Sequence, residues 1–153
     1  MLRRLLVPFL FLAVCLFCVG GPVRAQQNIP TEVSAFVANG STMIPFRSLL
    51  EWMGAQVTWN AAQQRVDARR GGMTVTLWVG RRQAQVNGQA RPMDVAPVVI
   101  QNHTFIPLRF VAESLGARVD WNPQTWRVTV ADGSHVGILP VSRGGPQATR
   151  PGR

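Results

Sequence analysis

TMIPFRSLLEWMGAQVTWN, residues 42–60, is followed sixty-two residues later by TFIPLRFVAESLGARVDWN, residues 104–122. At this offset, residues 39–68 and 101–130 share twelve identities in thirty positions. Agreement of this extent in one register indicates a duplicated unit. We therefore expect one structural unit to be used twice, over residues of about 33–70 and 95–131.

Each copy has the pattern of a strand, a short helix and a β-hairpin. A proline, Pro45 or Pro107, stands at the expected first helical position, where its missing N–H costs no hydrogen bond. Apolar residues then recur at helical spacing until Gly54 or Gly116, because glycine adopts the positive φ that ends a helix. In the first copy the apolar residues are Phe46, Leu49, Leu50 and Met53.

The segments after each helix alternate in polarity. Val57 with Trp59, and Val119 with Trp121, are expected on the buried face of a hairpin. Between the copies, residues 87–88 (Asn-Gly) separate two short strands, which is a strong hairpin signal. Many short strands and two short helices predict an α+β fold with mainly antiparallel sheet.

The N-terminal segment, residues 1–25, has the features of a secretory signal peptide. A basic start, MLRR, precedes fifteen mostly apolar residues, and Val23 and Ala25 occupy the small-residue positions of a cleavage site. We expect cleavage after Ala25, with an uncleaved anchor as the alternative. Both cysteines, Cys15 and Cys18, lie inside this segment, so disulfides, thiolate catalysis and cysteine metal sites are excluded from the mature chain. The expected location is extracellular, at the cell surface or in the periplasm.

The mature chain is expected to consist of one domain, residues 26–131, and a tail, residues 132–153. Whether the two copies share one core or form two subdomains is left open by the sequence. The tail is rich in Gly, Pro and Arg without a sustained period, so we predict disorder there, with HVGILPV, residues 135–141, the only part expected to dock.

The mature chain is basic. Without the three arginines of the predicted signal it has 16 − 3 = 13 Arg, no Lys and 7 acidic residues, a net charge of +6. This charge attracts polyanions such as an acidic wall polymer, but the arginines are dispersed and solubility is the simpler interpretation. Export and the lack of a recognisable binding motif argue against nucleic acid as a partner.

Two arginine pairs flank the predicted strand MTVTLW. Arg69-Arg70 and Arg81-Arg82 would lie about 23 Å apart across a strand of about 7 residues, too far for one compact anion site. Together with Trp78 they are candidate contacts for an extended polymer. Solvated turns are the simpler interpretation.

The doubled pattern resembles the copper amine oxidase N-terminal-like family, also called stalk-domain proteins. The resemblance covers about residues 33–131 and implies an antiparallel sheet wrapped around a helix, in secreted or surface proteins that serve as stalk or attachment units. Asn60 and Asn122 depart from it, since the family more often has Asp after Trp. The matching residues that we regard as structural are Pro45, Arg47, Gly54, Trp59, Pro107, Arg109, Gly116 and Trp121.

The residue inventory excludes the oxidase chemistry in the family's name. Copper amine oxidases form their quinone from a tyrosine and hold copper with three histidines, whereas this chain has no Tyr and only His103 and His135. Ser134 and His135 are sequence neighbours, which do not normally form a nucleophile and base pair. His103 is interpreted as a solvated turn residue. No metal-ligand spacing and no carboxylate pair is recognisable. We expect no enzyme activity, no metal and no cofactor.

Arg47 and Arg109 are the least explained residues of the motif. Each lies in a first helical turn with Glu51 or Glu113 four residues later, the weaker orientation for such a pair. The favoured interpretation is that the guanidinium ties the helix start to carbonyls or an acid of the sheet. The alternative is contact with an external anion or carboxylate.

These observations predict an exported, non-catalytic attachment or interaction module of the cell envelope. Its partner would be a cell-wall or surface polymer or another envelope protein, with membrane contact only through an uncleaved signal. The alternative is a polyanion- or glycan-binding accessory protein, for which Trp52 or Trp78 would line a sugar groove. A small hydrolase has only the family's association with enzymes in its favour.

Overall fold

The computed structural model describes residues 26–133 and 135–146. The predicted signal peptide with its cleavage site, Ser134, and residues 147–153 of the predicted tail lie outside the described residues. None of the helices in the described part of the chain has the length and hydropathy that a membrane span requires.

The described residues form two short helices and thirteen strands, so the fold is mostly β. Most strand pairs are antiparallel, as predicted. The elements are β1 (Gln26–Asn28), β2 (Ala35–Ala38), β3 (Ser41–Pro45), α1 (Phe46–Trp52), β4 (Gln56–Asn60), β5 (Arg65–Arg70), β6 (Met73–Trp78), β7 (Gln83–Val86), β8 (Gln89–Pro92), β9 (Val98–Ile100), β10 (His103–Pro107), α2 (Leu108–Ser114), β11 (Arg118–Asn122), β12 (Arg127–Asp132) and β13 (His135–Ser142).

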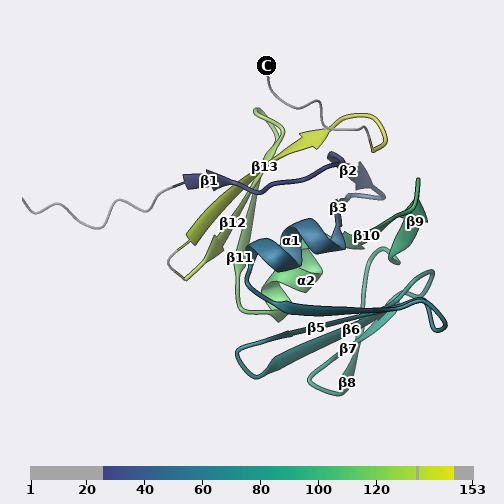
Figure 1. Ribbon diagram of the computed structural model, residues 1–153. Helices are drawn as coiled ribbons and strands as arrows, with labels where there is room; N and C mark the ends of the chain where they lie inside the picture. The colour runs from purple at the N-terminus through teal and green to yellow at the C-terminus, as the bar shows by residue number, and fades with distance from the viewer. Residues whose placement is uncertain (1–25, 134, 147–153) are drawn as a thin grey trace, which may run out of the picture.

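The strands form two sheets with both helices between them (Figure 1). The larger sheet has the order β11-β12-β13-β2-β3-β10-β9, with β1 beside β13. The smaller sheet has the order β4-β5-β6-β7-β8. Only two pairings among the described strands are parallel, those of β13 with β1 and with β2. The larger sheet contains strands of both copies, because β2 and β3 of the first copy lie between β13 and β10, and β3 and β10 are hydrogen-bonded neighbours.

Both copies contribute to one main core. The inner faces of α1 and α2 bury Leu49 and Val111 completely, and Ile44 and Ile106 from the central strands lie in the same cluster. Burial of each such side chain contributes about 1.5–3 kcal/mol. A smaller cluster covers the opposite face of the central strands and includes Phe36, Met43 and Phe105. The helices, too short to be stable alone, are therefore held by packing between the sheets.

The helix ends follow the sequence signals, with one correction. Gly54 and Gly116 end the helices at φ +68° and +89°, and each donates its N–H to the carbonyl three residues earlier. Pro45 and Pro107 stand one residue before the predicted position, as N-caps with ψ of 128° and 110°. The reason is that both prolines still belong to paired strands, where an extended ψ is required.

The predicted hairpins are present. β4 pairs with β5 and β11 with β12, each over five residues in antiparallel register. Asn87 and Gly88 connect β7 to β8 with φ of +52° and +78°, the left-handed conformations of a tight hairpin turn. The Asn87 side-chain oxygen also accepts the N–H of Thr74, which fixes the turn against β6.

Residues 135–141, the part of the tail that we expected to dock, do so, and with Ser142 they are a regular strand that the composition did not predict. They form β13, which lies inside the larger sheet between β12 and β2. Gly137, Leu139 and Val141 alternate on its buried face, and β11-β12-β13 begin sixty-two residues after β4-β5-β6. The composition was misleading because Gly137 has a packing role: a Cβ there would lie 2.6 Å from the ring of Trp52. Only glycine lets this strand approach α1.

Candidate functional site

Arg70, predicted as a partner contact, instead forms a hydrogen bond and an ion pair with other parts of the same chain. Its Nη1 donates to the carbonyl of Leu115 at 3.0 Å, and its Nη2 lies 2.7 Å from Oδ1 of Asp132, whose side chain is 6 % exposed. Leu115 caps the C-terminal end of α2, where carbonyls lack helical partners. Arg70 therefore joins the smaller sheet to α2 and β12, and is not available to an external partner.

Arg47 and Arg109 do not have the tying role predicted for them. The Arg47 side chain is 64 % exposed, with Glu51 at 4.0 Å and the Phe46 ring centre at 5.1 Å from its guanidinium. Arg109 is also exposed, and within the described ranges none of the observed hydrogen bonds or ion pairs involves it. Surface pairs of this kind contribute little to stability. The prediction is wrong because both side chains are exposed to solvent at the helix starts; the tie that the structure does show, from Arg70, is to the opposite end of α2.

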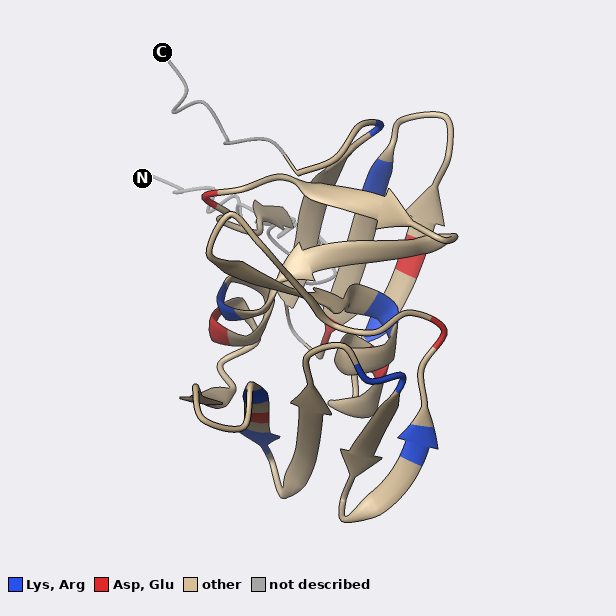
Figure 2. Cartoon of the chain, turned by 90° about the vertical axis from the view of Figure 1, so that its right-hand side faces the viewer, with Lys and Arg blue, Asp and Glu red and all other residues tan. Residues whose placement is uncertain are grey.

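The other members of the arginine pairs lie at opposite ends of β6, and the arginines of the described chain are dispersed over several elements (Figure 2). Arg69 is exposed near the end of β5, whereas Arg81 and Arg82 are exposed in the turn after β6, at the opposite end of that strand. The Arg81 guanidinium lies 5.9 Å from the ring centre of half-buried Trp78. The fold therefore does not gather these four residues into one site.

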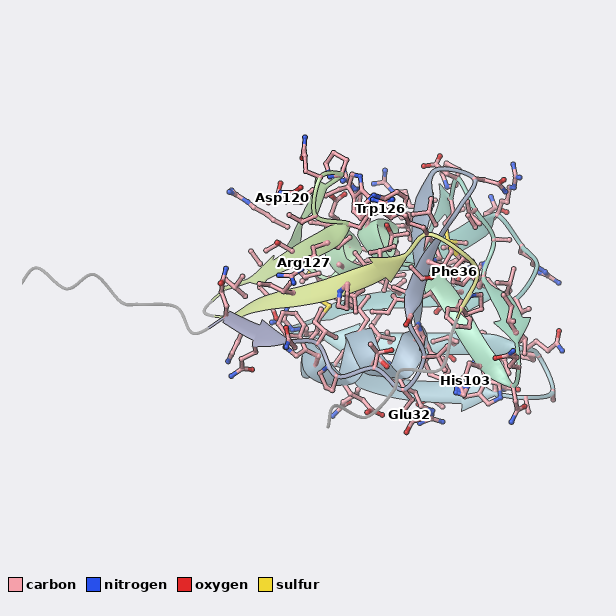
Figure 3. The ribbon with its side chains drawn as sticks, turned by 90° about the horizontal axis from the view of Figure 1, so that it is seen from above. Glu32, Phe36, His103, Asp120, Trp126 and Arg127 are labelled. Atoms are coloured by element: carbon pink, nitrogen blue, oxygen red, sulfur yellow. The ribbon has the colours of Figure 1, made fainter. Side chains whose placement is uncertain are left out.

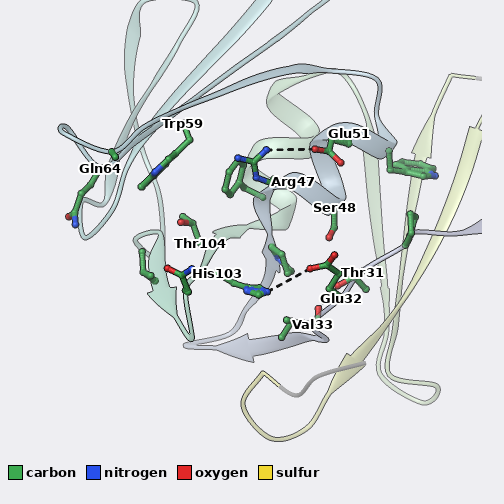
Figure 4. A pocket seen from close by; sticks show the side chains of 17 residues that line it. Thr31, Glu32, Val33, Arg47, Ser48, Glu51, Trp59, Gln64, His103 and Thr104 are labelled. Atoms are coloured by element: carbon green, nitrogen blue, oxygen red, sulfur yellow. Dashed lines mark hydrogen bonds and ion pairs between the residues drawn. The ribbon is translucent and has the colours of Figure 1, made fainter. Parts of the chain in front are cut away.

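The first groove, a hollow of about 940 Å³, lies between the start of α1 and the β9–β10 hairpin (Figure 4). Its walls come from both copies, and Trp59 packs beside Phe46 at a ring distance of 6.2 Å on one side. Trp59 thus packs against the core and also lines the first groove. The lining residues are Pro30, Thr31, Glu32, Val33, Pro45, Phe46, Arg47, Ser48, Glu51, Trp52, Trp59, Ala61, Gln64, Val99, Asn102, His103 and Thr104.

The charged groups of the first groove are spread around its rim. The Arg47–Glu51 pair lies on α1, and His103 Nε2 lies 4.0 Å from the carboxylate of Glu32. His103 Nδ1 is buried without a hydrogen-bond partner, so this histidine is not the fully solvated turn residue expected. A carboxylate, an imidazole, a guanidinium and an indole around one hollow are groups that orient a polar ligand.

The second groove, a hollow of about 700 Å³, lies between α2, the β11–β12 hairpin and the tip of the β2–β3 hairpin. Trp121 and Trp126 meet edge to face at 5.5 Å, and the Arg143 guanidinium lies 4.7 Å from the Trp126 ring centre. Figure 3 labels Trp126. The lining residues are Val37, Gly40, Ser41, Thr42, Pro92, Met93, Asp94, Pro107, Leu108, Arg109, Phe110, Glu113, Val119, Trp121, Pro123, Trp126 and Val128.

The two grooves are lined by residues at matching positions. In each, one copy supplies the helix start and the tryptophan of its hairpin, and the other copy supplies the neighbouring strand tips. The sequence motif pointed to Trp59 and Trp121, but Trp126 and His103 as lining residues were missed. The pairs sixty-two residues apart include Arg47 with Arg109, Glu51 with Glu113, Trp59 with Trp121, Val99 with Val37, and Thr104 with Thr42.

The catalytic and metal-binding sets that would indicate an enzyme are not assembled in what the structure describes. No three His, Cys, Asp or Glu residues of the described part lie close enough together to hold a metal ion. His103 and Glu32, an imidazole and a carboxylate on the rim of the first groove, are 4.0 Å apart, beyond the reach of about 2.6–3.2 Å that proton transfer needs.

Comparison with known proteins gives two matches. The sequence profile of the copper amine oxidase N-terminal domain matches residues 23–130. A protein named "Protease inhibitor" from Brevibacillus choshinensis is 27 % identical over 104 residues, which is 68 % of this chain and 31 % of that protein. The chain therefore spans about a third of the length of this curated relative.

Proposed function

The chain belongs to the copper amine oxidase N-terminal domain family, and from this premise we propose that it is an exported, non-catalytic attachment or interaction module of the cell envelope. The observation that carries the proposal is the first groove: it brings ligand-orienting groups around a large open hollow without a nucleophile, a base and an orienting group within hydrogen-bond reach. Such an arrangement suits binding. The match to an N-terminal domain supports a role outside catalysis.

We infer that the binding surface arose by duplication of one unit. Corresponding elements of the two copies begin sixty-two residues apart, from β3 and β10 to β6 and β13. At the centre of the β3–β10 pairing, Ile44 pairs with Ile106, which is its equivalent in the other copy. The pairs on either side, Pro45 with Phe105 and Met43 with Pro107, are exchanged when the two copies are exchanged. This register supports a local two-fold axis through β3 and β10, and it explains why each groove takes walls from both copies.

The proposed partner is a cell-wall or surface polymer, or another envelope protein. A polyanion is the alternative, and it would use Arg69, Arg81 and Arg82, which remain exposed. The two alternatives respond differently to salt, because interactions between exposed charges are screened within about 10 Å at 0.1 M ionic strength.

Retention on purified cell envelope tests this proposal. The doubly substituted chain with Glu32→Gln and Arg47→Gln is compared with the matched change Arg109→Gln in the second groove. We expect the double substitution to reduce retention about tenfold, equivalent to about 1.4 kcal/mol, and Arg109→Gln to reduce it less than twofold. Salt-sensitive retention that is lost instead when Arg81 and Arg82 are replaced by Gln would favour the polyanion alternative. Absence of retention at any salt concentration would contradict both.

Protease inhibition is a second candidate, suggested by the name of the Brevibacillus choshinensis relative. The turn carrying Arg81 and Arg82 is exposed and held at both sides, because Gly80 donates to the carbonyl of Pro97 at 2.8 Å and Met93 donates to that of Arg82 at 2.7 Å. A loop held in one conformation loses little entropy on binding. Inhibition of an arginine-specific serine protease that disappears in Arg81→Gln or Arg82→Gln would support it. Unchanged protease rates at high micromolar concentration of the chain would exclude it.

A further inference from the structure

The second groove differs from the first in where its aromatic side chains stand. Each groove is lined by three of them, Phe46, Trp52 and Trp59 in the first and Phe110, Trp121 and Trp126 in the second, and most charged positions are kept. In the second copy Leu108 and Ser114 replace Phe46 and Trp52, and rings or proline replace polar or small residues elsewhere. This leaves a groove with three aromatic side chains and several prolines on its walls. The replacements at equivalent positions are Ser48 by Phe110, Ala61 by Pro123, and Gln64 by Trp126.

Trp126 occupies a backbone conformation that a bulky residue rarely adopts. Its φ is +52°, matching +47° at Gln64, so this conformation belongs to the turn in both copies. A bulky side chain in the left-handed region is an outlier, and such strain costs roughly 1–3 kcal/mol. The indole is in edge-to-face contact with Trp121, and a 2.9 Å hydrogen bond from the N–H of Val141 to the Trp126 carbonyl holds the backbone of the turn. The same turn of the first copy carries Gln64, so the turn itself does not require a ring, and the indole of Trp126 points to a use in binding.

The groove also has the charges to receive a cation. Asp94 and Glu113 are exposed on its lining, and neither forms an ion pair within the part of the chain described. Arg109 lies on the same rim and Arg143 lies above Trp126, so the four side chains carry no net charge together, and the unpaired carboxylates of Asp94 and Glu113 are the local acceptors for a cation. Arg143 already shows that this aromatic wall accepts a guanidinium, since it lies 4.7 Å above Trp126.

We propose that the second groove binds an extended, proline-containing peptide segment of a partner protein that carries arginine. A polyproline helix is ordered before it binds and docks into aromatic-lined grooves at low entropic cost. Its rings would lie against Trp121 and Phe110, and its guanidinium would pair with Glu113 or Asp94 as a charge-assisted hydrogen bond. This inference rests on the proposed function as an interaction module, and it names the class of partner for the second groove.

A peptide fits better than a sugar. Pyranose rings stack on an open indole face, whereas one face of Trp126 is occupied by Arg143 and the two indoles meet edge to face. The unpaired carboxylates also favour a ligand with a fixed positive charge, which neutral sugars lack. A glycan is therefore an outcome for the experiment to detect.

Calorimetric titration of the chain from Gln26 to Arg153 with the synthetic peptide acetyl-Pro-Pro-Arg-Pro-Pro-Arg-Pro-amide tests the proposal. The control peptide has glutamine in place of both arginines. We expect binding of the arginine peptide and at least about tenfold weaker binding of the control, because loss of a charge-assisted contact costs about 1.4 kcal/mol or more. Trp126→Gln and Glu113→Gln should each weaken binding about tenfold. Trp126→Gln introduces the residue that the first copy has at this turn, so folding should be preserved, and circular dichroism melting verifies this.

The matched control is Glu51→Gln, the equivalent change in the first groove, which should alter binding less than about twofold. Equal binding of both peptides, or no binding of either, would overturn the proposal. Binding of a chitin tetramer that is lost in Trp126→Gln would overturn it in favour of a glycan. Peptide binding that appears only when residues 144–153 are removed would make the chain's own C-terminal segment the occupant, and would overturn the partner protein. If peptide binding fails while retention on cell envelope persists, only this inference is lost and the proposed function stands.

Discussion

Arg70→Met should destabilise the fold strongly, although Arg70 lies outside the shared motif. The substitution keeps the apolar stem but removes the donors to the Leu115 carbonyl and to Asp132. Removing one partner of a buried ion pair costs roughly 3–5 kcal/mol because the other charge is left unpaired. The Arg70 side chain is 29 % exposed, so water can partly solvate Asp132 after the substitution. We therefore expect a loss of about 3 kcal/mol.

Urea unfolding monitored by tryptophan fluorescence measures this loss. The matched control is Arg69→Met, whose side chain is exposed, and it should change the free energy of unfolding by no more than about 0.5 kcal/mol. Asp132→Asn and the double substitution complete a double-mutant cycle, in which contacting residues should show a coupling energy of about 0.5–3 kcal/mol. If Arg70→Met and Arg69→Met are equally stable, or the coupling energy is zero, the tie between the smaller sheet and α2 is refuted.

Three further predictions concern packing and the motif arginines. Gly137→Ala should cost about 3 kcal/mol and lower the melting temperature, because its Cβ would lie 2.6 Å from the Trp52 ring and 2.7 Å from Ile29; an unchanged melting temperature in a circular dichroism scan would contradict the close approach. A chain ending at Gly133 lacks β13, so β12 and β2 lose a common partner, and it should show no cooperative unfolding transition in calorimetry. A native-like transition would mean that β13 is dispensable. Arg109→Gln should change stability by less than about 0.5 kcal/mol in urea, and a loss above about 2 kcal/mol would restore the tying role first assigned to it.

The two grooves change how the family motif is understood. Gly54 and Gly116 have folding roles, and so do the paired prolines before each helix. Arg47 and Arg109 do not, because each is exposed at the rim of a groove. The arginine that recurs in the motif is thus better explained by its place at the rim of each groove than by the core.

The sequence alone determined the local structure. Helix ends at Gly54 and Gly116, the hairpin turn at Asn87, and the alternating strands around Trp59 and Trp121 were all predictable. These features depend on backbone conformation and on the spacing of apolar side chains within a few residues, so a short stretch of sequence is enough to predict them. Each helix begins one residue later than predicted, because Pro45 and Pro107 are still paired within the sheet.

Only the tertiary structure decided which distant residues meet. Arg70 finds the Leu115 carbonyl forty-five residues away, and β13 becomes a strand because β12 and β2 offer it hydrogen-bonding edges on both sides. The glycine and proline content of residues 135–142 did not predict this strand, because composition reflects local conformational preference and does not show which strands are available for pairing. The grooves follow the same rule, because each is closed by segments far apart in the sequence, such as those of Arg47 and Thr104 in the first groove and of Thr42 and Arg109 in the second, which the central pairing of β3 with β10 brings together.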